Sequence, residues 1–65
     1  MLGKNIKAFR VKLKLTQEGL AQKAKIPYNT IIKLESGASP TPRIDTVIKV
    51  ADALNVSIDK LIGRE

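Results

Sequence analysis

Residues 28–36, Tyr-Asn-Thr-Ile-Ile-Lys-Leu-Glu-Ser, hold the side chains best suited to recognising another molecule. Ile31 and Leu34 have the spacing of buried positions on a short helix. At 100° per residue, such a helix points an amide, an apolar group, a cation and a hydroxyl outward. An amide matches adenine, a cation matches guanine or phosphate, and an apolar group matches the thymine methyl. This face therefore suits the major groove of DNA. The outward residues are Asn29, Ile32, Lys33 and Ser36, with Tyr28 at the margin.

The composition disfavours catalysis and metal binding. The 65 residues include no cysteine and no histidine, so disulfides, thiolate ligands and the commonest general base are excluded. The six acidic residues are scattered, and they form no nucleophile–base pair and no metal-ligand spacing. We therefore expect no enzyme activity, no metal, no cofactor and no small-molecule ligand.

The charge balance points to a polyanionic partner. The chain has twelve lysines and arginines but only six acidic residues, which gives a formal net charge of +6. No apolar run approaches the roughly 18 residues of a membrane span, and residues 1–3 lead into lysines without the apolar core of a signal peptide. Aromatic anchors for a membrane-surface helix are almost absent. We expect a cytoplasmic protein without a membrane partner.

A helix expected over residues 17–24 must hold the helix at 28–36 in position. Thr16 suits its N-cap, and a turn of about three residues joins it to 28–36. Pro27 suits the first position of the following helix, where its missing N–H is tolerated, and Gly37 suits that helix's C-terminal cap. The inward residues of 17–24 are Leu20, Ala21 and Ala24.

Three further helices are expected around this pair, at residues 4–13, 43–54 and 58–62. Residues 38–42, with two prolines, are expected to form a loop. Ser57 suits the N-cap of the last helix. The inward positions are Leu2, Ile6, Phe9 and Leu13 on the first helix and Ile44, Val47, Val50, Ala51 and Leu54 on the fourth, which Asn55 would end; Gly63 would end the last.

These elements predict an all-α fold. Strand-like alternation is absent, and short links between five short helices favour a compact bundle. We expect one domain over residues 1–65, with the two central helices at about 16–37. A core of this size supplies only about 3–5 kcal/mol.

The chain resembles the XRE/Cro-like, phage-repressor type of helix-turn-helix DNA-binding domain, which has the lambda-repressor-like fold. The likeness covers about residues 4–62, and four segments carry it in the family's order and spacing. They are Leu-Thr-Gln-Glu-Gly-Leu-Ala-Gln-Lys-Ala at 15–24, Thr-Ile-Ile-Lys-Leu-Glu-Ser-Gly at 30–37, Asp-Thr-Val-Ile-Lys-Val-Ala-Asp-Ala-Leu at 45–54 and Val-Ser-Ile-Asp-Lys-Leu at 56–61.

The resemblance implies roles for individual residues. It makes 28–36 the recognition helix and pairs Arg10 with Glu35 in an ion pair that ties the first helix to it. Together with the outward face of 28–36, it predicts contacts with DNA bases from Tyr28, Asn29, Ile32 and Lys33. Contacts with the DNA backbone are predicted from Gln17, Lys25, Thr30, Ser36 and Arg43.

Three residues depart from the family pattern. Lys25 stands where glycine is common in the turn, so a left-handed backbone there would cost about 1 kcal/mol or be avoided. Pro27 replaces a capping serine or threonine, and Gly19 replaces an acidic residue. These departures bear on the geometry of the turn and leave the motif intact.

The predicted function is a sequence-specific, double-stranded DNA-binding transcriptional regulator. One small module buries only about 600–1,000 Å² on DNA, so we expect a homodimer on a two-fold operator. The C-terminal helices are the expected dimer surface because Ile58, Leu61 and Ile62 are all apolar. A protein–protein or antitoxin-like module, or the DNA-binding end of a longer regulator, remains the alternative.

Overall fold

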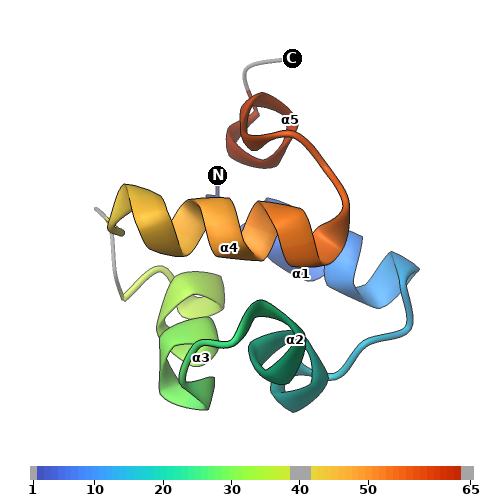
Figure 1. The fold of residues 1–65 in the computed structure, drawn as a ribbon, viewed down its shortest axis with the longest axis vertical. Helices are drawn as coiled ribbons and strands as arrows, with labels where there is room; N and C mark the ends of the chain where they lie inside the picture. Colours follow the sequence, from blue (N-terminus) through green and yellow to red (C-terminus); the bar gives the residue numbers. More distant parts are fainter. Residues whose placement is uncertain (1, 39–41, 64–65) are drawn as a thin grey trace.

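The computed structural model describes residues 2–38 and 42–63. These residues form only helices and their connections, which confirms the predicted all-α fold (Figure 1). Residues 39–41 of the expected loop lie outside the described residues. Within the described ranges, no helix is long and apolar enough to cross a bilayer. The helices are α1 (Leu2–Lys12), α2 (Gln17–Ala24), α3 (Tyr28–Ser36), α4 (Ile44–Leu54) and α5 (Ile58–Ile62).

Side-chain caps begin two of the helices. The Gly19 amide donates to the Thr16 hydroxyl oxygen at 2.9 Å, at the start of α2. The Lys60 amide donates to the Ser57 hydroxyl oxygen at 3.0 Å, at the start of α5. These bonds satisfy amides that have no partner within the helix, so the two predicted caps are confirmed.

Helix α3 begins at Tyr28 as predicted, but Pro27 has a different role from the one expected. Pro27 is the N-cap of α3 rather than its first helical residue, with φ −62° and ψ 144°. The proline ring fixes φ but leaves ψ free, so the residue can remain extended while its carbonyl accepts from the Thr30 amide at 3.0 Å. Pro27 therefore begins the helix through its backbone and supplies no capping oxygen.

The turn between α2 and α3 adopts the left-handed backbone despite its lysine. Lys25 has φ 59° and ψ 44°. Its amide donates to the Gln22 carbonyl at 3.2 Å, and the Ile26 amide donates to the Ala21 carbonyl at 3.0 Å. These bonds close the end of α2 in the manner of a Schellman turn, and they offset a conformational cost of about 1 kcal/mol.

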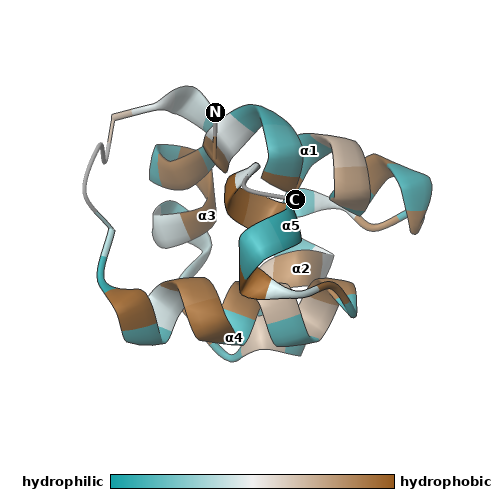
Figure 2. Cartoon of the chain, turned by 90° about the horizontal axis from the view of Figure 1, so that it is seen from above, coloured by the Kyte–Doolittle hydropathy of each residue, from teal (hydrophilic) through white to brown (hydrophobic). Residues whose placement is uncertain are grey.

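The largest fully buried side chains of the core come one from each helix. The residues that form this core cluster are all apolar, so the core itself is stabilised by apolar burial. Hydrophobic and hydrophilic bands alternate along α4 because one side of this helix packs inward (Figure 2). The five side chains are Ile6, Leu20, Ile31, Val50 and Leu61.

Two predicted core positions were wrong because they lie at helix ends. Leu13 follows the last residue of α1 and is 45% exposed, and Ile44 is the first residue of α4 and is 65% exposed. The apolar spacing of the sequence continues to the end of the helix, but the last residues of the stripe leave the core where the helix extends past its neighbours (Figure 1). Conversely, Ala53 is buried, because α4 packs against both α2 and α5 and so buries more than one stripe.

Candidate nucleic-acid interface

The outer face of α3 presents the side chains that were predicted to reach DNA bases. Asn29 and Lys33 are exposed, while Tyr28 and Ile32 are 44% and 37% exposed. The opposite face of α3 is fixed by Ile31, which is fully buried in the core. The helix therefore presents an amide, a phenol, an apolar group and a cation together, all of them outside the core.

The residues predicted to contact the DNA backbone lie on α2, on the turn after it, on α3 and at the N-cap of α4. Lys25 is exposed in the turn before α3, and Gln17 is half-buried at the start of α2. Thr30 and Arg43 line one shallow pocket together with Lys33, so the structure brings these three residues near one another. Arg43 pairs only loosely with Asp45, at 3.6 Å with both side chains largely exposed, and a surface pair of this kind contributes little.

Ser36 closes the C-terminal end of α3. Its hydroxyl donates to the Lys33 carbonyl at 3.2 Å and accepts from the Ala38 amide at 3.3 Å. Gly37 follows with φ 82°, a backbone that glycine adopts without steric strain. The end of α3 is thus held in a defined shape, with Ser36 exposed beside it.

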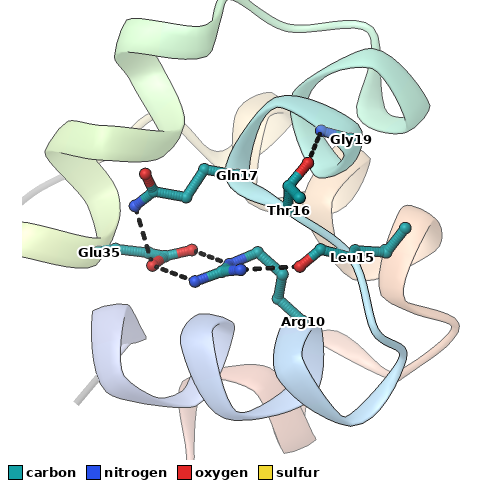
Figure 3. A network of polar contacts seen from close by, with 6 residues as sticks. All are labelled: Arg10, Leu15, Thr16, Gln17, Gly19 and Glu35. Atoms are coloured by element: carbon teal, nitrogen blue, oxygen red, sulfur yellow. Dashed lines mark hydrogen bonds and ion pairs between the residues drawn. The ribbon is translucent and has the colours of Figure 1, made fainter.

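Arg10, Gln17 and Glu35 form a polar network that joins three helices (Figure 3). The Arg10 Nε donates to Glu35 Oε2 at 2.7 Å, and Nη2 donates to Oε1 at 3.2 Å. The Gln17 Nε2 donates to the same Oε1 at 3.2 Å. Arg10 also reaches the Leu15 carbonyl through Nη1 at 2.7 Å. Glu35 therefore anchors α3 to α1 and α2 at once.

The network is shielded from solvent. The side chains of Arg10 and Glu35 are 12% and 6% exposed, and the fork of the guanidinium matches the carboxylate with two bonds. Every described buried side-chain nitrogen or oxygen has a partner. Removing one member would leave the other charge buried without compensation, which is strongly destabilising.

Gly3 is a positioning residue that the sequence did not reveal. A Cβ atom at Gly3 would overlap the Leu34 carbonyl oxygen and lie 2.9 Å from the Glu35 carbonyl oxygen. The absence of a side chain therefore lets the first turn of α1 approach the last turn of α3. The only signal in the sequence is a glycine directly before the helix predicted at residues 4–13, where it has no evident local purpose.

No metal-binding arrangement is found in the described part of the chain, where His, Cys, Asp and Glu never gather in threes. The arrangement that the structure does contain is a braced, exposed helix within a basic chain. Such a face can donate hydrogen bonds, contact methyl groups and neutralise negative charge.

A family model described as helix-turn-helix matches residues 6–61, which is most of the chain. The chain belongs to this family, the XRE-type helix-turn-helix proteins, which is a family of DNA-binding transcription regulators.

Curated relatives carry names consistent with this family. The chain is 34% identical over 64 residues to the immunity repressor protein of Bacillus phage phi105, covering 98% of this chain and 44% of the relative. It is 36% identical over 64 residues to the HTH-type transcriptional regulator ImmR of Bacillus subtilis, covering 98% and 50%. It is 41% identical over 49 residues to the cryptic phage CTXphi transcriptional repressor RstR of Vibrio cholerae, covering 75% and 43%. The chain spans about half the length of the curated relatives it matches.

Proposed function

We propose that this chain is a sequence-specific double-stranded DNA-binding unit of a transcription regulator, with α3 in the major groove. The observation that carries the proposal is the outer face of α3, where Asn29, Ile32 and Lys33 are exposed while the inner face is buried. The names of the relatives, repressors and transcriptional regulators, agree with it.

We assign two kinds of DNA contact to these residues: recognition of base edges and contact with the DNA backbone. Asn29 offers the amide that pairs bidentately with adenine, and Ile32 offers an apolar surface for a thymine methyl. Lys33 is a point charge that serves guanine or phosphate. Gln17, Lys25 and Arg43 lie on other elements and are assigned to the backbone, where their contacts would fix the register of α3.

Selection of bound sequences from a random duplex pool tests this function. The proposal expects enrichment of a short motif, and binding to this motif at least about a thousandfold tighter than to mixed duplex. The competing function is a protein–protein module. It would give no enrichment, and the same experiment would then overturn the DNA-binding proposal.

The dimer that we propose on a two-fold operator uses the C-terminal helices. Ile44 and Ile48 are exposed one turn apart on α4, and Ile58 and Ile62 are half-buried on α5. Leu61, which was expected to contribute to this surface, is fully buried in the core and therefore does not take part. Apolar side chains left at the surface of a small domain are the natural contacts of a second copy.

Sedimentation of the chain with an operator duplex tests the dimer. Ile48→Lys should lower the population with two copies per duplex, because the cation would be buried against apolar surface. Val11→Lys is the matched control, since Val11 is also an exposed aliphatic residue but lies on α1. Equal effects of the two substitutions would exclude the proposed surface.

A further inference from the structure

A shallow pocket lies where the end of α1 meets the link between α4 and α5. Its volume is about 190 Å³, and we call it the α1–α5 pocket. Both views of the molecule place the end of α1 on the side away from α3 (Figures 1 and 2). The pocket therefore lies outside the proposed DNA-binding face, and its role is independent of that function. Its apolar floor consists of Phe9, Leu13, Leu54 and Val56.

The walls of the α1–α5 pocket are fixed by backbone hydrogen bonds. The Leu13 amide donates to the Phe9 carbonyl at 3.1 Å, and the Leu15 amide donates to the Arg10 carbonyl at 3.0 Å. On the other wall, the Val56 amide donates to the Ala51 carbonyl at 3.0 Å. The pocket is thus formed before any ligand arrives, which lowers the ordering cost of binding.

Part of the apolar surface of this pocket is exposed to solvent. Leu13 is 45% exposed, although α1 and its turn hold it in place. An exposed leucine alone needs no explanation. Here it adjoins the half-buried side chains of Phe9 and Val56, so the three make a connected apolar floor in a concave surface.

The rim of the pocket carries positive charge. Lys12 and Lys60 stand on it beside Asn55, and none of the described residues that line the pocket is acidic. A complementary ligand would place carboxylates on the two lysines and an apolar side chain between them. A nucleic-acid backbone lacks such an apolar side chain, so its chemistry fits the rim but not the floor.

We propose that the α1–α5 pocket docks an acidic segment of another protein, which inserts one leucine- or phenylalanine-sized side chain onto Phe9 and Leu13. Lys12 and Lys60 hold the flanking carboxylates as surface ion pairs. At 100° per residue, Lys60 points away from Ile58 and Ile62 on α5, so docking and the proposed dimer use different sides of that helix. The segment and DNA can be bound together.

The test uses a short fluorescein-labelled peptide in which two leucines alternate with glutamates. Anisotropy gives its affinity for the wild-type chain, and backbone amide NMR shifts locate its site. Lys12→Glu and Lys60→Glu should each weaken binding by about fivefold, since a surface pair becomes a repulsion. Replacing the leucines by serines should weaken binding by about tenfold, because the apolar contact is lost.

Matched controls separate this pocket from general attraction to a basic chain. Lys49→Glu changes the net charge as much as Lys12→Glu does, but Lys49 lies on α4 outside the pocket. It should therefore lower the affinity for the peptide by less than about twofold. Thermal melts confirm that each variant is folded. Shifts should lie in residues 9–15 and 54–60, and an excess of operator duplex should not displace the peptide.

Several results would overturn the proposal. They are the absence of peptide binding, shifts centred on α3, displacement of the peptide by DNA, and an equal loss from Lys49→Glu and Lys12→Glu. Phosphatidylglycerol vesicles serve as a second probe. If they bind through Lys12 and Lys60 while the peptide does not, the surface takes a lipid rather than a protein segment.

Discussion

Asn29 and Lys33 project from one face of α3, one turn apart, yet they offer different chemistry to DNA. A bidentate amide–adenine pair discriminates by about 1–3 kcal/mol against other bases, whereas an ammonium distinguishes guanine from phosphate poorly. Asn29→Ala should therefore relax base preference at one position of each half-site and leave affinity for mixed duplex nearly unchanged. Lys25→Ala, in the turn before α3, should lower the affinity for all DNA sequences by the same factor.

The measurement is the affinity of each protein for the best site and for its single-base variants. Lys25 and Asn29 are both exposed, so neither substitution disturbs the core. If Asn29→Ala lowered the affinity for every DNA sequence by the same factor, Asn29 would contact the DNA backbone. Base recognition would then belong to Tyr28, Ile32 and Lys33.

The ion pair of Arg10 and Glu35 should contribute to folding more than to DNA contact. Arg10→Ala leaves a carboxylate that is almost fully shielded from solvent, and we expect a loss of about 3 kcal/mol in unfolding free energy. This is comparable with the stability of the whole domain. Urea unfolding of the single and double alanine variants, with Glu35→Ala, measures the coupling. Additive losses would show that the two residues act independently.

At the scale of the elements, Gly3 should prove more important than its helix propensity suggests. Gly3→Ala should destabilise the chain by about 1–3 kcal/mol, because the new methyl group overlaps the Leu34 carbonyl and α1 must move from α3. Alanine is otherwise the better helix former, by about 0.5–1 kcal/mol. Packing therefore predicts that Gly3→Ala lowers the stability, whereas helix propensity alone predicts that it raises the stability. Thermal unfolding of the variant decides between these two outcomes.

Gly19→Ala is the control for this comparison. A Cβ at Gly19 meets only the Thr16 hydroxyl oxygen at 3.2 Å and a Leu15 methyl group at 3.8 Å, and both atoms are side-chain atoms. We expect no loss beyond about 0.5 kcal/mol, because the gain in helix propensity offsets the small shift of the hydroxyl. Equal losses at both glycines would argue against a special approach of α1 to α3.

The sequence predicted elements better than it predicted their contacts. The bounds of α2 and α3 follow from local signals, such as Thr16 before one helix and Gly37 after the other. Leu13 and Ile44 were misassigned because periodicity does not tell where a neighbouring helix stops. The role of Gly3 depends on how α1 crosses α3, which is a tertiary property with no local pattern.

The predicted site shows the same division between local pattern and tertiary contact. The outward row of α3 follows from 100° per residue once Ile31 is placed inside. The pairing of Arg10 with Glu35 came from family resemblance, since residues 25 positions apart carry no local sign of contact. That Gln17 shares the same carboxylate oxygen could be found only in three dimensions.

At the scale of the whole molecule, the charge of +6 should make DNA binding strongly dependent on salt. If about four phosphates are neutralised per subunit, log affinity should fall with log salt at a slope of about −3.6 per subunit. Lys25→Ala should reduce this slope by about one unit, while Lys49→Ala on α4 should leave it unchanged. A wild-type slope near zero would contradict binding through the DNA backbone.

The shared carboxylate of Glu35 has a thermodynamic consequence for recognition. Because Arg10 from α1 and Gln17 from α2 both hold it, α3 is ordered before it meets a ligand. A segment that folds on binding adds a large negative heat-capacity change as it buries further apolar surface. A braced α3 contributes no such term, so the heat capacity of DNA binding should reflect the contact surface alone.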